Sequence, residues 1–151
     1  MEQNKEQMMV AALENGSVID HIPTGKLFTI VQLLGLDTFK NEVIIANNLD
    51  SNVMGKKGLI KISNKFFTEA EISKLAVVCR GIRLTVIKDY KVAEKREVTL
   101  PEELTNIVKC ANPVCITNNE PMKTVFYRMD KDTLKCRYCG KEQKLKDIKL
   151  K

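Results

Sequence analysis

The chain carries CANPVC at residues 110–115 and CRYC at residues 136–139, two cysteine pairs that determine the architecture of its C-terminal third. Each pair fits within one tight turn, and the linker lets the two turns face each other, as a tetrahedral thiolate site requires. Four thiolates leave no coordination position for water or substrate, so the spacing predicts a structural metal site. We expect one Zn²⁺ per chain, with four ligands: Cys110, Cys115, Cys136 and Cys139.

The cysteines lie in a segment of about fifty residues, a size at which a hydrophobic core alone seldom gives a stable fold. Residues 124–128 and 133–136 are typical of short strands between metal turns. Pro101 precedes a stretch, residues 102–108, that we expect to be a short helix. The pattern predicts a small zinc-ribbon β domain over residues 101–151.

Strand and helix signals alternate through the first hundred residues. Helical spacing of apolar residues follows Thr24, the expected N-cap, and ends at Gly35. A second helix is predicted by the capping box that Thr68 forms with Glu71. The polar residues 47–58 are expected to form a loop. The predicted strands cover residues 17–22, 43–46, 59–62, 83–87 and 92–98.

This order is β-α-β-β-α-β with one added strand. It predicts an α+β fold, a ferredoxin-like antiparallel sheet with two helices, over residues 1–100. The zinc-ribbon β domain would follow it.

Composition limits the possible classes of protein. The 151 residues are 44% hydrophobic and 29% charged, which is globular composition. Residues 1–100 carry 14 Lys and Arg against 12 Asp and Glu, and residues 101–151 carry 11 against 7, so the basic charge is concentrated in the second part. A basic protein suits a polyanionic partner without specifying which one. The polar start and the lack of an 18-residue apolar run predict a cytoplasmic protein.

His21, the only histidine, follows Asp20 in an otherwise apolar strand. Strand neighbours point to opposite faces, so this pair alone favours ordinary solvated polar residues. Lys61 and Lys95 lie in the third and fifth predicted strands, and a ferredoxin-like sheet places the third strand beside the first. If the two ammonium groups converge on the imidazole, they would form a site for phosphates. An equally good interpretation is that these lysines lie on edge strands, where they prevent aggregation and bind nothing.

The C-terminal residues, taken alone, are also compatible with two other functions. The first is nucleic-acid binding by a zinc ribbon, which draws on the basic residues Lys135, Arg137, Lys141, Lys144, Lys146, Lys149 and Lys151. The second is a four-thiolate iron redox protein of the rubredoxin type. Such a site generally pairs two C-x2-C turns, whereas the first pair here is C-x4-C.

A family resemblance runs nearly end to end. It rests on GSVIDHIP at residues 16–23, MGKKGLIKI at 54–62, DYKV at 89–92 before Lys95, LPE at 100–102, and the cysteine spacing with LKC at 134–136. The chain resembles the regulatory chains of aspartate carbamoyltransferase, an enzyme of pyrimidine biosynthesis.

The resemblance implies a non-catalytic, cytoplasmic subunit of a hetero-oligomer. Its N-terminal domain would bind the effectors CTP, UTP and ATP and pair with a second regulatory chain. Its zinc domain would dock on the catalytic chain, and six chains of each kind would assemble together. No nucleic acid and no membrane would be involved.

The resemblance also assigns site residues. Asp20 and Lys61 would face the ribose, and His21 and Lys95 the phosphates. Backbone groups near Leu13, Tyr90 and Val92 would contact the base. The chain departs from some family members at three positions, which are Gln7 (near Lys5) in place of a lysine, Thr85 in place of an asparagine, and Gly140 in place of an acidic residue.

Overall fold

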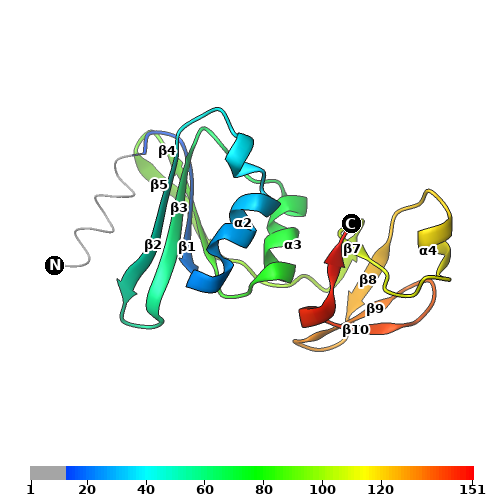
Figure 1. The fold of residues 1–151 in the computed structure, drawn as a ribbon. Coiled ribbons are helices and arrows are strands. Elements are labelled where there is room, and N and C mark those ends of the chain that lie inside the picture. Colours follow the sequence, from blue (N-terminus) through cyan, green and yellow to red (C-terminus); the bar gives the residue numbers. More distant parts are fainter. Residues whose placement is uncertain (1–12) are drawn as a thin grey trace. The chain divides into compact units, whose positions relative to one another are not determined.

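A computed structural model describes residues 13–151, so Lys5 and Gln7 lie outside the described residues. The chain forms two compact units (Figure 1). The first contains the described residues up to Glu71 together with Gly81–Val98, and the second contains Ile72–Arg80 and Thr99–Lys151. Both units consist mainly of antiparallel sheet with few and short helices, which confirms a mixed α and β fold.

One five-stranded sheet forms most of the first unit. Its strand order is β2-β3-β1-β4-β5, and every neighbouring pair is antiparallel. The central strand β1 therefore lies between β3 and β4, as we expected for the first predicted strand. The strands are β1 (Gly16–Ile22), β2 (Val43–Ser51), β3 (Gly55–Ser63), β4 (Arg83–Lys88) and β5 (Lys91–Glu97).

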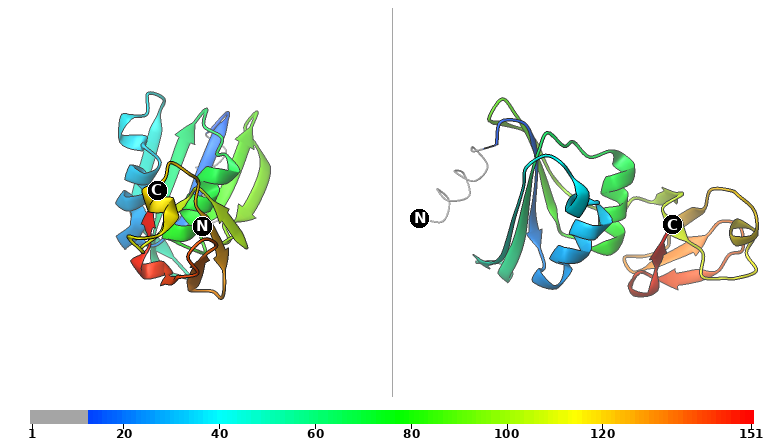
Figure 2. Two further views of the ribbon diagram at one scale, coloured as in Figure 1. Left: turned by 90° about the vertical axis from the view of Figure 1, so that its right-hand side faces the viewer. Right: turned by 45° about the horizontal axis from the view of Figure 1, so that its top comes forward.

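Helix α2 (Leu27–Leu33) lies on one face of this sheet (Figure 2). Its residues Leu27 and Ile30 are fully buried. The prediction that Thr24 caps this helix is wrong, because Thr24 begins a separate 3-10 turn, η1 (Thr24–Lys26), and neither turn nor helix has a side-chain cap. The helix ends as predicted at Gly35, whose φ of 67° is left-handed, and η2 (Leu36–Thr38) follows.

The second predicted helix is α3 (Glu69–Val78). Its capping box is confirmed, because the Thr68 hydroxyl accepts a hydrogen bond from the Glu71 N–H at 3.2 Å and the Glu71 carboxylate accepts one from the Thr68 N–H at 3.1 Å. In the first unit, Glu69 at the start of the helix also pairs with Arg96 of β5 at 3.0 Å.

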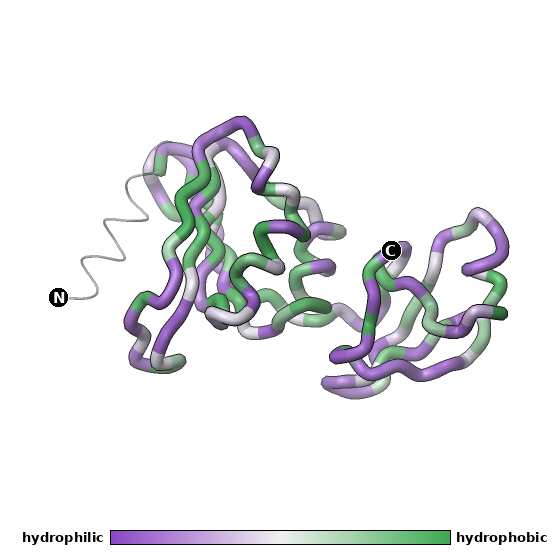
Figure 3. The backbone as a smooth tube through the Cα atoms, in the orientation of Figure 1, coloured by the Kyte–Doolittle hydropathy of each residue, from purple (hydrophilic) through white to green (hydrophobic). Residues whose placement is uncertain are grey.

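The prediction of a loop over residues 47–58 is wrong. Strands β2 and β3 continue through most of it as a hairpin, and Asp50 pairs there with Lys56 across the two strands. The hairpin end is largely hydrophilic in Figure 3, with hydrophobic residues only in short stretches, so it lacks the apolar alternation by which a half-buried strand is recognised. Cross-strand pairing keeps the solvated end of the hairpin extended, whereas Lys57 and Gly58 at its base are buried.

The second unit contains a four-stranded sheet of order β10-β9-β8-β6 and a two-stranded sheet of β11 and β7. The expected helix over residues 102–108 is wrong, because Leu104 pairs with Phe126 of β8 and both side chains are buried. The strands β8 and β9 agree with the predicted ones. The elements are β6 (Glu103–Thr105), β7 (Val108–Lys109), α4 (Ile116–Asn119), β8 (Val125–Arg128), β9 (Thr133–Cys136), β10 (Glu142–Lys144), η3 (Leu145–Asp147) and β11 (Lys149–Leu150).

Candidate functional site

A β-bulge at the end of β1 places Asp20 and His21 together. Ile19 pairs with Ile60 of β3, but Ile22 pairs with Gly58, so β1 contains one extra residue here. His21 has a φ of 60°. Ile19 and Ile22 are both fully buried, whereas the two residues between them keep side-chain exposures of 19% and 18%.

The bulge breaks the strand alternation, so the expectation that Asp20 and His21 point to opposite faces is wrong. His21 Nδ1 lies 3.4 Å from a carboxylate oxygen of Asp20, and the backbone N–H of His21 donates to the other oxygen at 2.7 Å. The pair therefore forms one polar cluster at the end of the central strand.

Lys57 of β3 completes this cluster. Its ammonium nitrogen lies 3.1 Å from Asp20 Oδ1 and 3.2 Å from Oδ2, and its side chain is only 5% exposed. The sequence analysis missed Lys57 because it assigned the residue to a loop. The signal was present in GKKGLIKI, where Lys57, Leu59 and Lys61 recur with the period of two that marks one face of a strand.

Lys61 and Lys95 lie in one row across the same face. Directly paired residues of antiparallel strands point to the same side of a sheet, and the register runs from Lys61 to Val18, then to Thr85 and to Lys95. Three strand spacings place Lys61 and Lys95 roughly 14 Å apart along this row. Lys61 is buried and Lys95 is exposed.

The positions expected to contact a base lie at the other end of β1. Leu13 is buried in a small apolar cluster with Val18, Leu59 and Ile87. The N–H of Tyr90 donates to the carbonyl of Glu14, next to Leu13, at 2.9 Å. Tyr90 is half exposed and has a φ of 65°.

Val92 pairs with Ile87, which belongs to the cluster around Leu13, and its side chain is exposed. The face that carries Lys57, Lys61 and Lys95 thus has an apolar end beside Leu13 and a charged end beside Asp20. Such a surface offers ammonium groups to phosphates, a carboxylate to hydroxyls and peptide groups to a heterocycle.

The second unit brings Cys110, Cys115, Cys136 and Cys139 together. Their four sulfur atoms lie within 4.8 Å of one another, with Cys110 and Cys139 at 3.6 Å and Cys115 and Cys136 at 3.8 Å. A tetrahedral ion with bonds of about 2.3 Å holds sulfur atoms about 3.8 Å apart, so the cluster fits such an ion. It is therefore a metal site.

Local hydrogen bonds shape both cysteine turns. In the first turn, the N–H of Cys115 donates to the carbonyl of Asn112, and the Asn118 amide donates to the carbonyl of Cys110. In the second turn, Gly140 has a φ of 76° and its N–H donates to the carbonyl of Cys136. Glycine adopts this left-handed conformation without strain.

The sulfur atoms differ in their electrostatic surroundings. Burial raises the pKa of Cys110 to about 12 and also raises the pKa of Cys136. Burial acts in the same direction on Cys139, but a hydrogen bond from the backbone of Lys141 and contacts with neighbouring groups outweigh it and lower the pKa of Cys139 to about 7. Burial therefore opposes the ionisation of Cys110 and Cys136, and a bound cation would favour it.

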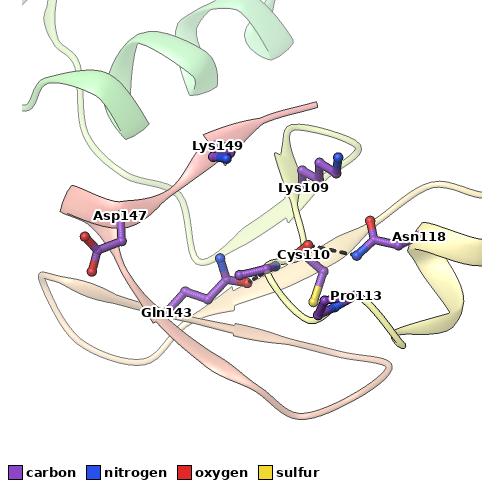
Figure 4. Close-up of a pocket in the computed structure, with 8 residues that line it drawn as sticks. Lys109, Cys110, Pro113, Asn118, Gln143, Asp147 and Lys149 are labelled. Atoms are coloured by element: carbon purple, nitrogen blue, oxygen red, sulfur yellow. Dashed lines mark hydrogen bonds between the residues drawn. The ribbon is translucent and has the colours of Figure 1, made fainter.

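A pocket of about 340 Å³ adjoins the metal site (Figure 4). Gln143, which is buried, lies across it from Asn118 and accepts a hydrogen bond from the backbone of Ala111 at 3.0 Å. Lys109 and Lys149 lie at its rim and are direct partners in the sheet of β7 and β11. The pocket thus combines two lysines and the carboxylate of Asp147 with Cys110.

No helix among the described residues is long and apolar enough to cross a membrane.

Comparison with known proteins gives matches over nearly the whole chain. Residues 8–99 match the family model of the aspartate carbamoyltransferase regulatory chain, allosteric domain, and residues 102–149 match that of the same chain's metal binding domain. Aspartate carbamoyltransferase regulatory chains from Bacteroides thetaiotaomicron and Phocaeicola vulgatus are each 56% identical over 99% of this chain and 99% and 98% of their own. The regulatory chain from Pyrococcus horikoshii is 40% identical over 94% of this chain and 96% of its own.

Proposed function

Because the chain belongs to the family of aspartate carbamoyltransferase regulatory chains, we propose that it binds CTP, UTP and ATP on the face of the five-stranded sheet that carries Lys57, Lys61 and Lys95. The observation that supports this most strongly is that Lys57, Lys61 and Lys95 lie on one face of the sheet, with Lys57 in contact with Asp20 and Asp20 in contact with His21. The protein is a non-catalytic, allosteric subunit in pyrimidine biosynthesis, and it transmits effector binding to a separate catalytic chain.

The architecture assigned to each domain is part of the proposal. Residues 1–100 form a ferredoxin-like effector domain to which β5 is added, and residues 101–151 form a zinc-ribbon domain. The element order β1-α2-β2-β3-α3-β4 and the placement of β1 between β3 and β4 support the first assignment. The antiparallel strands around four cysteines support the second.

Each polar group of the face has a role. Lys95 and His21 bind phosphate oxygens, with Lys95 as a mobile point charge at the exposed end of the row. Asp20 accepts hydrogen bonds from the ribose hydroxyls, and Lys61 donates to the sugar. Lys57, which was not among the residues predicted from the sequence, holds the Asp20 carboxylate in place.

The base is recognised by backbone groups. Leu13, Tyr90 and Val92 lie at the apolar end of the face, and peptide groups there would distinguish purine from pyrimidine by size and by hydrogen-bond pattern. CTP and ATP share the triphosphate and the ribose, so only this end separates them.

Regulation requires that an effector bind two quaternary states with different affinity, because a ligand with equal affinity for both shifts nothing. Couplings of this kind are typically about 1–3 kcal/mol. UTP is included among the effectors because it shares the pyrimidine ring, the ribose and the triphosphate with CTP.

The metal is zinc. Four cysteine thiolates in tetrahedral arrangement with no open position are characteristic of structural zinc sites. Thiols remain reduced and available to a metal in the cytoplasm, which is where we place the protein. The metal-binding domain docks on the catalytic chain, so the ion stabilises the surface that holds the assembly together.

A second regulatory chain pairs with the first through the effector domains. The exposed edge of β2 carries Ile44 and Ile45, which are 39% and 41% exposed. The other edge strand, β5, has the sequence KVAEKRE, whose charges oppose pairing with another strand. The β2 edge is therefore the surface proposed for the dimer.

The decisive experiment is calorimetric titration of CTP and of ATP into the full-length, zinc-loaded chain, with Lys95→Ala alongside. Competitive binding of both nucleotides to the wild type, weakened in the variant, is the expected result. A wild-type chain that binds neither nucleotide, alone and in complex with the catalytic chain, would refute the effector site.

A further inference from the structure

Gly58 lies between two bulges of the first unit. On one side, the register of β1 shifts between Ile19 and Ile22, and on the other side the register of β2 shifts between Ala46 and Leu49. Both shifts fall beside Gly58. At this point β1 and β2 each contain one residue more than the stretch of β3 with which they pair. A glycine inside a strand often marks such a close approach of neighbouring groups.

Sterics at Gly58 leave no room for a side chain. A Cβ atom there would lie 2.9 Å from Cδ1 of Leu27 and 3.5 Å from Cβ of Ile22. It would also lie 3.5 Å from Oδ1 of Asn47, a buried oxygen without a hydrogen-bond partner among the described residues. Leu27 is fully buried, so it cannot move into solvent to relieve the contact.

The backbone conformation of Gly58 does not itself require glycine. Its φ lies outside the left-handed range, unlike that of Gly55 in the same strand at 77°. The requirement for a small residue at position 58 is therefore one of space, and it is set by the side chain of Leu27.

A short and tight connection joins Leu27 to the bulge. Ile22 ends β1, and the turn η1 that follows is closed by a 2.8 Å hydrogen bond from the N–H of Lys26 to the carbonyl of Pro23. A displacement of Leu27 is thus carried through the four intervening residues to Ile22 and its neighbour His21. Packed elements transmit such shifts because protein interiors are close to incompressible.

We propose that Gly58 and Leu27 are a size-matched pair that positions His21 and Asp20 in the effector site. Gly58 admits Leu27 against β3, this contact sets the end of β1, and the bulge then turns both polar side chains toward Lys57. Gly58 and Leu27 touch no ligand and act only through these residues. The inference rests on the proposed function of the face as an effector site.

The test uses Gly58→Ala in the full-length, zinc-loaded chain, with two readouts. Calorimetry measures the affinity for CTP and for ATP, and we expect both to fall about fivefold or more, because overpacking displaces neighbouring groups. His21 is the only histidine, so the NMR signal of its ring Cε1 proton reports on the bulge alone. We expect this signal to shift in the unliganded variant.

The matched control is Gly25→Ala, which adds the same methyl group in η1, where no atom lies within 4 Å of the new Cβ. It should change neither the affinity nor the His21 signal. The rescue variant is Gly58→Ala with Leu27→Val, which removes the atom that the new methyl group contacts. It should restore most of the affinity and return the His21 signal toward its wild-type position.

The outcomes separate this inference from the proposed function. If Gly58→Ala only lowers the unfolding midpoint, and the wild-type affinity and His21 signal persist, the pair is merely structural and the inference is overturned. The same holds if Leu27→Val fails to rescue. If the wild type binds no nucleotide, the proposed function fails, and the His21 signal alone then decides whether Gly58 positions the bulge.

Discussion

The ammonium nitrogen of Lys57 lies 3.1 Å from the carboxylate of Asp20, and the Lys57 side chain is almost wholly removed from solvent. A buried ion pair of this kind costs desolvation energy, and its partners depend on each other once they are in place. Because His21 contacts the same carboxylate, one lysine orients two groups of the proposed effector site.

Replacing Lys57 by methionine should therefore destabilise the first unit by about 2–4 kcal/mol, because the Asp20 charge would remain largely buried without its partner. Urea unfolding followed by circular dichroism measures this loss. The control is Lys56→Met, which breaks the exposed pair with Asp50 and should cost less than about 0.5 kcal/mol. Equal losses in the two variants would mean that the Lys57 pair contributes no more than a surface pair.

Substitution of Lys95 by alanine should weaken CTP and ATP to the same degree, by about ten- to a hundredfold, since a charged hydrogen bond to phosphate contributes about 1.5–3 kcal/mol. Calorimetric titration gives both affinities. Lys40→Ala removes an exposed lysine from the loop before β2 and should leave them unchanged. A loss confined to one nucleotide would show that Lys95 contacts the base and not the shared phosphates.

Removal of the metal by a chelator or a mercurial should unfold β6 to β11, because binding of the ion supplies folding free energy to this part of the chain. Hydrogen exchange resolves the two units in one experiment, and the amides of β1 to β5 should remain protected. Release of the catalytic chain should accompany the unfolding. An assembly that survives complete loss of the metal would contradict the proposed interface.

The capping box predicts a pH dependence of stability. Burial acts to raise the pKa of Glu71, but hydrogen bonds from Thr68 and Lys65 outweigh it and hold the pKa below its usual value of 4.5. A carboxylate with a lowered pKa in the folded state stabilises the fold above pH 4.5, and this contribution is lost as the pH falls through the folded-state pKa.

Glu71→Gln should thus cost about 1 kcal/mol at pH 7, and the difference from wild type should shrink as the pH is lowered below 4.5. Unfolding free energies measured between pH 7 and pH 3 give this difference directly. Glu42→Gln, at an exposed position, should stay within about 0.5 kcal/mol of wild type at pH 7. A Glu71→Gln penalty that does not vary with pH would show that the carboxylate charge has no role in the cap.

The edge of β2 predicts a change in oligomeric state. Charged residues in place of Ile44 and Ile45, as in Ile44→Glu with Ile45→Lys, should weaken the regulatory dimer at least about tenfold, because edge charges oppose strand pairing. Sedimentation equilibrium measures the dissociation constant. Val53→Lys, at the 83% exposed hairpin tip, provides a matched control. A dimer unaffected by the β2 substitutions would have to use another surface.

The sequence by itself determined those features that depend on neighbouring residues. The C-x4-C and C-x2-C spacings predicted the cluster of four cysteines because each pair is confined to one turn. Thr68 and Glu71 identified the start of α3 because a capping box is complete within four residues. Gly35 identified the end of α2 because its left-handed φ is a local requirement.

Tertiary structure alone decided the features that depend on pairing between distant strands. The sequence predicts a helix over residues 102–108, but Leu104 pairs with Phe126 of β8. Burial against β8 outweighs the weak local preference of these residues for a helix. The polar end of the hairpin of β2 and β3 is held by cross-strand hydrogen bonds, and such bonds cannot be predicted from the spacing of hydrophobic residues. The bulge beside Gly58 is of the same kind. It depends on the pairing of β1 with β3, and it brings Asp20 to Lys57 and His21 to Asp20.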